Sequence, residues 1–385
     1  MKNNIITTAV TITLATTLIT ISGCATNTGY HSTYKTDNEN AKKISRVIPS
    51  YLNMTSQSWA YLQINQPIHP YDSNASIIDI RKKLIILGDL NQSFFQYNDL
   101  TYYDSSLFKA VKRFQWRHGL NADGIIDNKT IKALNVSPSE KVNILIASRD
   151  KWSQFSDKNN ANYILVNIPD FNLNVMQSGR SVFTSKVIIG TTYNQTPEVN
   201  SEITTMVFNP TWNVPKSIIS KEFAPTMMKD SSYLANNNIS IYGGNAEIIS
   251  PDSIDWMKVQ EYGTDLRFTQ SAGSHNVLGK VKFLFYNPHD IYLHDTTTKS
   301  LFAKQQRSFS HGCVRVEKPM ELAQYLLSHS GLNDINPYYE TEYKSATRYI
   351  KLKNPIPLHV AYITSWVDNQ GYTHFRNNIY KYPMQ

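Results

Sequence analysis

A cysteine follows a histidine at a spacing that could support nucleophilic catalysis. His294 is separated by fifteen residues from the sequence S-H-G-C, which ends at Cys313 and lies within the stretch SFSHGCVRVEKP. The thiolate is the reactive form of a cysteine, but a free thiol with a pKa of ~8.5 is only a few per cent ionised at pH 7. A nearby imidazole could accept the proton, or an imidazolium could lower the pKa of the thiol. Cys313 is therefore a candidate nucleophile, and His294 is a candidate for the group that activates it.

Other kinds of site use the same residue types. His294, His311 and Cys313 could supply three zinc ligands, but two ligands separated by one glycine are an unusual metal spacing, and the chain has no C-x-x-C. A papain-like protease has its cysteine before its histidine and a C-G-S-C-W sequence, and this chain has neither. A buried, inert cysteine is a further alternative. We expect no metal and no cofactor.

A strand must deliver His294, because this residue ends the apolar run IYLH. Tyr292 lies two residues earlier and therefore on the same strand face. Short runs typical of β-strands recur from about residue 160 to 370: YILVNI, NLNVM, VFTSKVII, TTMVFNP, KVKFLFYN, GCVRV and IPLHVAYITSWVD. The segment KPMELAQYLLSHSG interrupts them with a helix that begins at Pro319 and ends at Gly331. We predict a mainly β catalytic domain.

Residues 76–135 have the periodicity of helices. In SIIDIRKKLIILGDL, apolar residues recur every three or four positions, and Gly88 stands where a glycine would end the helix. A second helix is predicted over SSLFKAVKRFQWRHG, which ends at Gly119, and a third in DGIIDNKTIKALN, with Asp127 or Asn128 as its N-cap. These segments predict a compact unit of three helices.

The first 24 residues have the features of an export signal. Lys2 precedes an uncharged apolar stretch of ~13 residues, shorter than the ~20 that span a bilayer, and small residues lead to Cys24. Residues 25–42 are polar and are predicted to form a flexible tether. If the thiol of Cys24 is blocked by a modification, Cys313 remains the one free thiol of the exported protein. An unused thiol in an oxidising compartment is prone to oxidation. Export thus favours a catalytic role for Cys313.

Composition restricts the class of partner. The chain has 385 residues, of which 41% are hydrophobic, and this length permits two or three domains with proper cores. The formal net charge is +8 at pH 7, but the positive residues are scattered along the chain. Export also separates the protein from nucleic acid, so we expect no nucleic-acid partner.

Two stretches resemble known bacterial wall domains. The pattern H-x15-S-H-G-C-V-R resembles the signature of the L,D-transpeptidase (YkuD-type) catalytic domain, and AVKRFQWRHGLNADGIIDNKTIKALN resembles a small peptidoglycan-binding module. NPTWNVPKSI, AGSHNVLGKVKFLF and the C-terminal IPLHVAYITSWVDNQGYTHFRNNIY are similar to the larger Gram-negative members, which combine both domains. In those relatives a lid over the cleft is inserted at the position of residues 216–270. The stretch ISGC resembles a lipobox that would place lipid on Cys24, and the following Ala25 implies sorting to the outer membrane.

The resemblance implies roles for the residues of the signature. Cys313 would be the nucleophile and His294 its base. Gly312, which has no side chain, would let backbone N–H groups approach the oxyanion of an acyl-transfer intermediate. Ser310 and His311 belong to the same loop, and His311 would orient the backbone or the substrate, or would be only a hydrogen-bonded scaffold residue.

Arg315 and Tyr292 are expected to contact the substrate. Arg315 could bind a substrate carboxylate, or it could brace the loop through Glu317. The resemblance implies that Tyr292 is a substrate-contacting aromatic, and a packed core tyrosine is the alternative. Asp295 could orient His294, although the family more often uses a backbone carbonyl.

The expected fold class is α+β and multidomain, with a small three-helix peptidoglycan-binding module followed by a mainly β L,D-transpeptidase catalytic domain that contains an inserted lid. The expected segments are a lipoprotein signal peptide (1–24), a tether and N-terminal scaffold segment (25–75), the module (76–136), a helical linker (137–159), the catalytic domain (160–345, lid about 216–270) and a C-terminal strand segment that packs on the catalytic domain (346–385). We expect a Gram-negative periplasmic protein held at the outer membrane through Cys24.

The implied activity is that of a peptidoglycan L,D-transpeptidase that forms 3→3 cross-links, contributes to wall biogenesis and cell shape, and is a carbapenem target. Cys313 would form a thioester with a tetrapeptide donor stem and release D-Ala, and a second stem would be the acceptor. Protein partners are not predicted. The acceptor could instead be a lysine of a wall-linked lipoprotein, or water, so that the enzyme attaches or releases lipoproteins. A non-catalytic wall-binding lipoprotein is the alternative from another class, and ligand binding by the module also stays open.

Overall fold

The computed structural model describes residues 38–92, 99–155, 162–332 and 346–382. The predicted export signal and Cys24 lie outside these residues. In the described part of the chain, no helix is both long enough and apolar enough to cross a bilayer.

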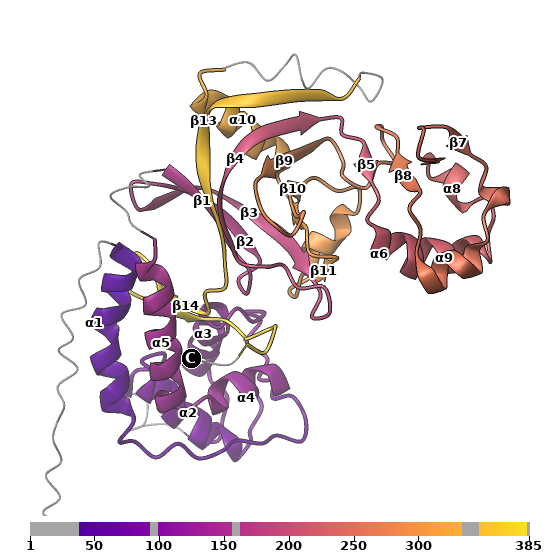
Figure 1. The fold of residues 1–385 in the computed structure, drawn as a ribbon. Helices are drawn as coiled ribbons and strands as arrows, with labels where there is room; N and C mark the ends of the chain where they lie inside the picture. Colours follow the sequence, from indigo (N-terminus) through magenta and orange to yellow (C-terminus); the bar gives the residue numbers. More distant parts are fainter. Residues whose placement is uncertain (1–37, 93–98, 156–161, 333–345, 383–385) are drawn as a thin grey trace, which may run out of the picture. The chain divides into compact units, whose positions relative to one another are not determined.

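Helices make up the part of the chain that precedes the first strand (Figure 1). They are α1 (Glu39–Met54), α2 (Ser76–Ile86), α3 (Ser105–Arg117), α4 (Asn128–Asn135) and α5 (Pro138–Ser153). The three helices predicted over residues 76–135 are confirmed as α2, α3 and α4. Their ends follow from local sequence: the Asp127 side chain accepts the Thr130 N–H at the start of α4, and Gly88 and Gly119 have positive φ after α2 and α3.

Helix α1 overlaps the segment that the sequence predicts to be a tether. It begins at Glu39, and the Asn38 side chain accepts hydrogen bonds from two backbone N–H groups of its first turn. Ala41 and Ile44 are fully buried, because the apolar spacing of α1 continues to its first turn. The prediction of a tether as far as Lys42 is therefore wrong for its last four residues.

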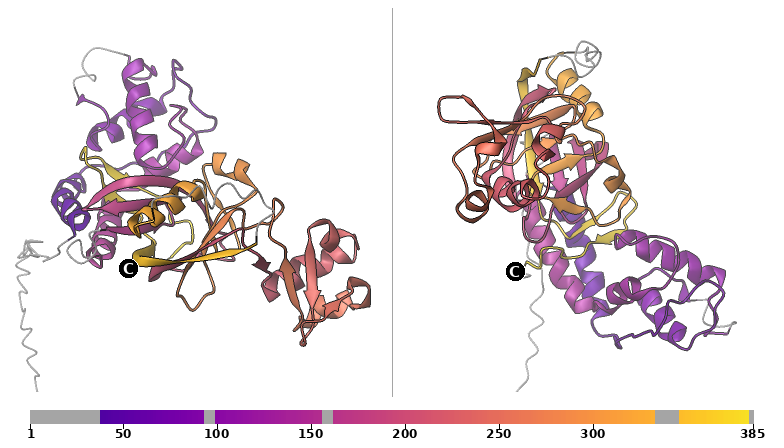
Figure 2. Two further views of the ribbon diagram at one scale, coloured as in Figure 1. Left: turned by 90° about the horizontal axis from the view of Figure 1, so that it is seen from above. Right: turned by 90° about the vertical axis from the view of Figure 1, so that its right-hand side faces the viewer.

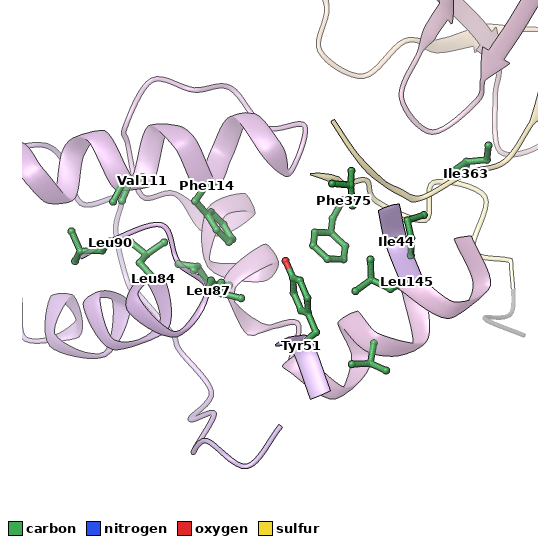
Figure 3. Packing of buried hydrophobic residues seen from close by; sticks show 14 of the residues in the cluster. Ile44, Tyr51, Leu84, Leu87, Leu90, Val111, Phe114, Leu145, Ile363 and Phe375 are labelled. Atoms are coloured by element: carbon green, nitrogen blue, oxygen red, sulfur yellow. The ribbon is translucent and has the colours of Figure 1, made fainter. Parts of the chain in front are cut away.

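The helices share one hydrophobic core with the C-terminal hairpin formed by β14 (Ser365–Val367) and β15 (Thr373–Phe375) (Figure 3). The rings of Tyr51 in α1 and Phe375 in β15 are 5.7 Å apart in an edge-to-face arrangement. The C-terminal segment thus packs on the helical part of the chain, in addition to the sheet contacts described below.

A buried ion pair joins α3 to the segment that follows α2. The Arg117 and Asp89 side chains are each 3% exposed, and Arg117 Nε donates to Asp89 Oδ1 at 2.9 Å. Arg117 Nη1 also donates to the Thr373 carbonyl oxygen at 3.2 Å, and this hydrogen bond links α3 to the hairpin. Removing one member of such an ion pair leaves an uncompensated buried charge.

In the described part of the chain, nine strands form the main sheet, in the order β11-β3-β12-β10-β9-β4-β13-β1-β2. Strand β2 also pairs with β3, so the sheet closes on itself. The strands are β1 (Asn162–Asn167), β2 (Asn172–Gln177), β3 (Arg180–Gly190), β4 (Val199–Phe208), β9 (Val281–Phe285), β10 (Leu293–His294), β11 (Ser308–Ser310), β12 (Val314–Val316) and β13 (Arg348–Ala361). Every β run predicted from the sequence contributes a strand to this sheet or to the hairpin. The helix predicted to begin at Pro319 is α10 (Pro319–His329), which lies between β12 and β13 in the sequence. Phe283, Leu293 and Val314 are fully buried in the core of the sheet.

Residues 212–270, which we call the lid segment, have a hydrophobic cluster of their own. Its strands pair in the order β5-β8-β6-β7 and are β5 (Trp212–Asn213), β6 (Ile239–Tyr242), β7 (Ile248–Ile249) and β8 (Arg267–Gln270). Its helical elements are α6 (Lys216–Ile218), the π-helical turn η2 (Ile219–Phe223), α7 (Ala224–Met227), α8 (Tyr233–Asn236) and α9 (Trp256–Tyr262). Figure 2 shows these elements from two further sides.

Candidate active site

Three neighbouring strands bring the predicted catalytic residues to one face of the main sheet. Strand β10 lies between β9 and β12, and His294 is directly opposite Lys282 on β9 and Arg315 on β12. Residues opposite one another in a sheet point to the same side, and side chains alternate along each strand. Leu293 faces the core, so Lys282, His294 and Arg315 form a row on the other face, which we call the site row.

Cys313 and Tyr292 lie immediately before β12 and β10, on the same side as the site row. Each precedes a member of the site row by two residues, and the Val314 N–H donates to the Tyr292 carbonyl oxygen at 3.1 Å, which continues the pairing of the two strands. The Tyr292 ring lies 5.6 Å from the His294 ring, edge to face. The structure therefore brings four of the predicted residues together on one surface.

His294 is a neutral base in this environment. Its side chain is 5% exposed, and burial lowers its pKa to about 3, with the positive charges of Arg315 and Lys282 acting in the same direction. Nδ1 is buried and has no hydrogen-bond partner among the described residues. The sequence suggested an imidazolium that lowers the pKa of the thiol as one possibility, and the structure disfavours it because desolvation and two cations oppose a charged ring.

The Asp295 side chain, considered from the sequence as an orienter of His294, bonds elsewhere. Its carboxylate accepts the Lys280 N–H at 2.9 Å and pairs with the Lys299 ammonium group. Only the backbone of Asp295 interacts favourably with the protonated ring of His294. The Asp295 carboxylate therefore braces the end of β10 and does not hold the imidazole of His294.

Cys313 is a protonated thiol at neutral pH. Burial raises the pKa of the thiol, while the Tyr292 backbone and the charges of Arg315 and Lys282 partly oppose this effect. A lowered thiol pKa, one of the two possibilities that the sequence left open, is therefore disfavoured in the resting enzyme, since desolvation outweighs the neighbouring charges. Thiol and imidazole are thus both neutral on this face of the sheet, and the two cations favour the thiolate as it develops.

The loop before Cys313 is held by short polar contacts. Ser310 Oγ donates to the Cys313 carbonyl oxygen at 2.5 Å and accepts the Gly312 N–H at 3.2 Å, and Thr196 Oγ1 donates to the Gly312 carbonyl oxygen at 2.8 Å. Gly312 has a φ of +117°, a backbone conformation that side chains disfavour. Because Ser310 occupies the Gly312 N–H, the Cys313 N–H, which donates to no group of the described residues, is the donor left for an oxyanion.

Arg315 and Tyr292 are both half-buried against Cys313. Arg315 Nε is buried without an acceptor in the described part of the chain, and Glu317 lies 3.5 Å from the Lys186 ammonium group, so the brace between Arg315 and Glu317 that the sequence allowed is not formed. Burial raises the pKa of Tyr292, and the charge on Cys313 adds to this effect, which places the phenol next to the sulfur. Both side chains can therefore contact a group that is bound at Cys313.

His311 lies outside the site row. Its side chain is 45% exposed, and Nε2 lies 2.5 Å from Oε1 of Glu222, a residue of the lid segment. This contact links the lid segment to the loop of the nucleophile. His311 is thus exposed, whereas His294 is buried. Among the described residues, no three His, Cys, Asp or Glu side chains are grouped as metal ligands.

Sequence reasoning missed three residues that the structure places at the site. Lys282 stands beside His294, Trp212 of the lid segment interacts with the Tyr292 side chain, and Glu222 contacts His311. The alternation in KVKFLF shows only that one lysine of that strand faces away from the core. The register between β9 and β10, which places Lys282 next to the base, has no signal in the sequence.

The chain matches two family descriptions. Residues 161–345 match the YkuD family, "L,D-transpeptidase catalytic domain", and residues 73–134 match "Putative peptidoglycan binding domain". A curated relative from Haemophilus influenzae, named "Putative L,D-transpeptidase", is 35% identical over 225 residues, which are 58% of this chain and 45% of that protein. The chain thus spans less than half the length of this relative.

Solved structures with the same designation show a more distant similarity. An L,D-transpeptidase from Stackebrandtia nassauensis is 13% identical, with a TM-score of 0.27 over 79% of this chain and 97% of that one. The L,D-transpeptidase from Xylanimonas cellulosilytica is 12% identical, with a TM-score of 0.24 over 78% of this chain and 100% of that one. TM-scores this low support no conclusion about function. The two family matches carry the assignment, and the chain combines an L,D-transpeptidase catalytic domain with an N-terminal peptidoglycan-binding domain.

Proposed function

We propose that this protein is an L,D-transpeptidase that forms 3→3 cross-links in peptidoglycan through a thioester on Cys313. The donor is a tetrapeptide stem, and the bond that breaks joins its third residue, a diamino acid, to the terminal D-Ala. The observation that supports the proposal is the position of His294 and Cys313 on one sheet face, next to the side chains of Lys282 and Arg315.

In the first step the Cys313 sulfur attacks the scissile carbonyl carbon while its proton passes to His294. Nδ1 of His294, which lacks a partner among the described residues, is the ring atom that we assign as the acceptor. Arg315 and Lys282 stabilise the negative charge on the sulfur as the proton leaves. The thiolate therefore exists only during the attack.

The tetrahedral intermediate places negative charge on the former carbonyl oxygen. The Cys313 N–H is positioned by the Ser310 contacts with the loop and can donate to this oxygen. Loss of one such donor typically lowers kcat by ~10²–10³-fold. The intermediate then collapses as His294 returns the proton to the amine of D-Ala, which leaves, and the thioester remains.

The acceptor completes the reaction. The free side-chain amine of a second stem attacks the thioester carbonyl, its proton passes to His294, and His294 returns the proton to the departing Cys313 sulfur. One peptide bond is broken and one amide bond is formed, so the reaction requires no external energy source. We further propose that lipid on Cys24 holds the enzyme at the outer membrane and that the module of residues 73–134 contacts the wall.

The proposal is tested by incubating purified protein with tetrapeptide-bearing muropeptides and identifying the products by mass spectrometry. A 3→3 cross-linked dimer together with free D-Ala supports the proposal. Tripeptide with D-Ala would indicate hydrolysis, and product formed only with a lysine-containing lipoprotein peptide would indicate an attachment enzyme. Unchanged muropeptides would indicate a wall-binding protein.

A further inference from the structure

Two cations of the site row have no anionic partner among the residues that the structure describes. Lys282 and Arg315 are both half-buried, and within the described ranges neither forms a salt bridge. Arg315 Nε is shielded from solvent and bonds to no acceptor there. These two side chains therefore carry uncompensated charge beside the nucleophile.

Two buried arginines elsewhere in the described residues have partners. Arg117 pairs with Asp89, and Arg307 donates to the carbonyl oxygens of Val187 and Phe171 at 3.2 and 2.9 Å. A buried charge without a partner is costly, and natural proteins rarely retain one without a use. The contrast indicates that Lys282 and Arg315 are kept for an anion that arrives with a ligand.

Cys313 does not supply that anion in the resting enzyme. Burial raises the pKa of the thiol and lowers the pKa of Lys282, so the lysine faces a neutral sulfur. The Lys282 ammonium group lies 5.5 Å from the centre of the Tyr292 ring, which directs it toward the part of the face that carries Cys313. A ligand that reaches Cys313 therefore also reaches Lys282.

We propose that Lys282 and Arg315 together form an anion subsite that binds a free carboxylate of the stem peptide and so positions its scissile carbonyl at Cys313. This inference rests on the proposed function. The two cations stand one strand away from His294 on either side, and neighbouring strands are about 4.8 Å apart. The terminal carboxylate of D-Ala is one residue, about 3.5 Å, from the scissile carbonyl, so both groups fit within the reach of these side chains.

Two carboxylates of the donor have the required chemistry. One is the terminal carboxylate of D-Ala, and the other is the side-chain carboxylate of the diamino acid. Comparing the natural tetrapeptide with a donor amidated at one or the other position identifies the group that is bound. For each donor, kcat and KM for D-Ala release are measured with the full chain.

The decisive variant is Lys282→Gln, with Lys282→Arg as the conservative variant and Lys351→Gln as a control that removes an exposed lysine from β13 of the same sheet. Loss of a charge-assisted hydrogen bond should raise KM for the natural donor by roughly 10- to 100-fold in Lys282→Gln. Lys282→Arg should recover part of this loss. The donor that lacks the bound carboxylate should have the same high KM with wild type and with Lys282→Gln. Lys351→Gln should have the kcat and KM of wild type for every donor.

A second measurement separates substrate binding from a general effect on the thiol. Iodoacetamide carries no carboxylate, so the change in its rate of Cys313 alkylation in Lys282→Gln measures the effect of Lys282 on the thiolate alone. The loss with the natural donor should exceed this change by roughly 10-fold or more. If Lys282→Gln instead slows alkylation and all donors by one common factor, Lys282 acts only on the thiolate and the anion subsite is refuted.

The subsite can also fail independently of the proposed function. Calorimetric binding of the natural and amidated tetrapeptides to Cys313→Ala protein tests the subsite without turnover. Tighter binding of the natural peptide, lost in Cys313→Ala/Lys282→Gln, supports the subsite even if wild type releases no D-Ala. Equal binding of all peptides, with D-Ala release by wild type, would overturn the subsite and leave the proposed function intact.

Discussion

Replacing His294 by alanine should convert a pH-independent acylation into one that follows ionisation of the thiol. Because burial holds the pKa of His294 at about 3, the imidazole of wild type accepts a proton at any pH well above that value. The wild-type acylation rate should therefore vary little between about pH 5 and 8 and should show no inflection near 6.5, the ordinary value for histidine. It should be lost only as the pH falls toward 3.

The size of the defect follows from the burial of Cys313. Its pKa lies above the ordinary value of ~8.5, so at pH 7 at most roughly one thiol in thirty is ionised in the variant. Loss of a general base typically costs ~10²–10⁴-fold, and we expect about 10²-fold or more at pH 7. Each unit of added pH should restore about tenfold until the pH passes the pKa of the thiol.

The rate is measured as formation of a covalent Cys313 adduct by intact-protein mass spectrometry from pH 5 to 10. His311→Ala is the matched control, because His311 is exposed and bonds to Glu222 instead of lying in the site row. This control should keep the flat profile of wild type, with a small or structural defect. A wild-type midpoint near pH 6.5, or a pH-rescued loss in His311→Ala with active His294→Ala, would refute the assignment.

Three further predictions concern other parts of the chain. Cys24→Ala should abolish lipid labelling and release the protein into the soluble periplasmic fraction, and unchanged membrane fractionation would contradict the lipid anchor. A carbapenem should leave a stable mass adduct on Cys313 that is absent from Cys313→Ala, and native protein without an adduct would argue against an accessible nucleophile. Arg117→Met should lower the free energy of unfolding measured in urea by about 3–5 kcal/mol, because it leaves the buried Asp89 carboxylate with only Arg113 Nε, at 3.8 Å, as a nearby cation. Combining it with Asp89→Leu should recover most of this loss, and an undiminished defect in the double variant would contradict the explanation.

The helices and strands were predictable because their signals are local. Asp127 caps α4, Gly88 ends α2, and the alternating run KVKFLF forms β9, each through contacts within a few residues. Helix α1 was not predicted, because polar composition outweighed the apolar spacing of Ala41 and Ile44, which are buried by helices far along the chain. The individual elements of the lid segment were not predicted either.

The site was predictable in its residue types and only partly in its electrostatics. The signature identifies Cys313 and His294, but their protonation depends on burial and on Lys282, which strand register places beside the base. The contact of Glu222 with His311 likewise joins residues that are far apart in the sequence. Pairings of this kind depend on the folded arrangement of segments and have no counterpart in any short stretch of sequence.

The central claim is tested most directly by weighing the intact protein after incubation with a tetrapeptide donor in the absence of an acceptor. The proposed mechanism predicts release of D-Ala and a mass gain equal to the donor minus D-Ala. The added mass should map to Cys313, be removed by hydroxylamine as a thioester is, and be absent from Cys313→Ala. Release of D-Ala by Cys313→Ala protein, or an adduct on any other residue, would contradict the thioester mechanism.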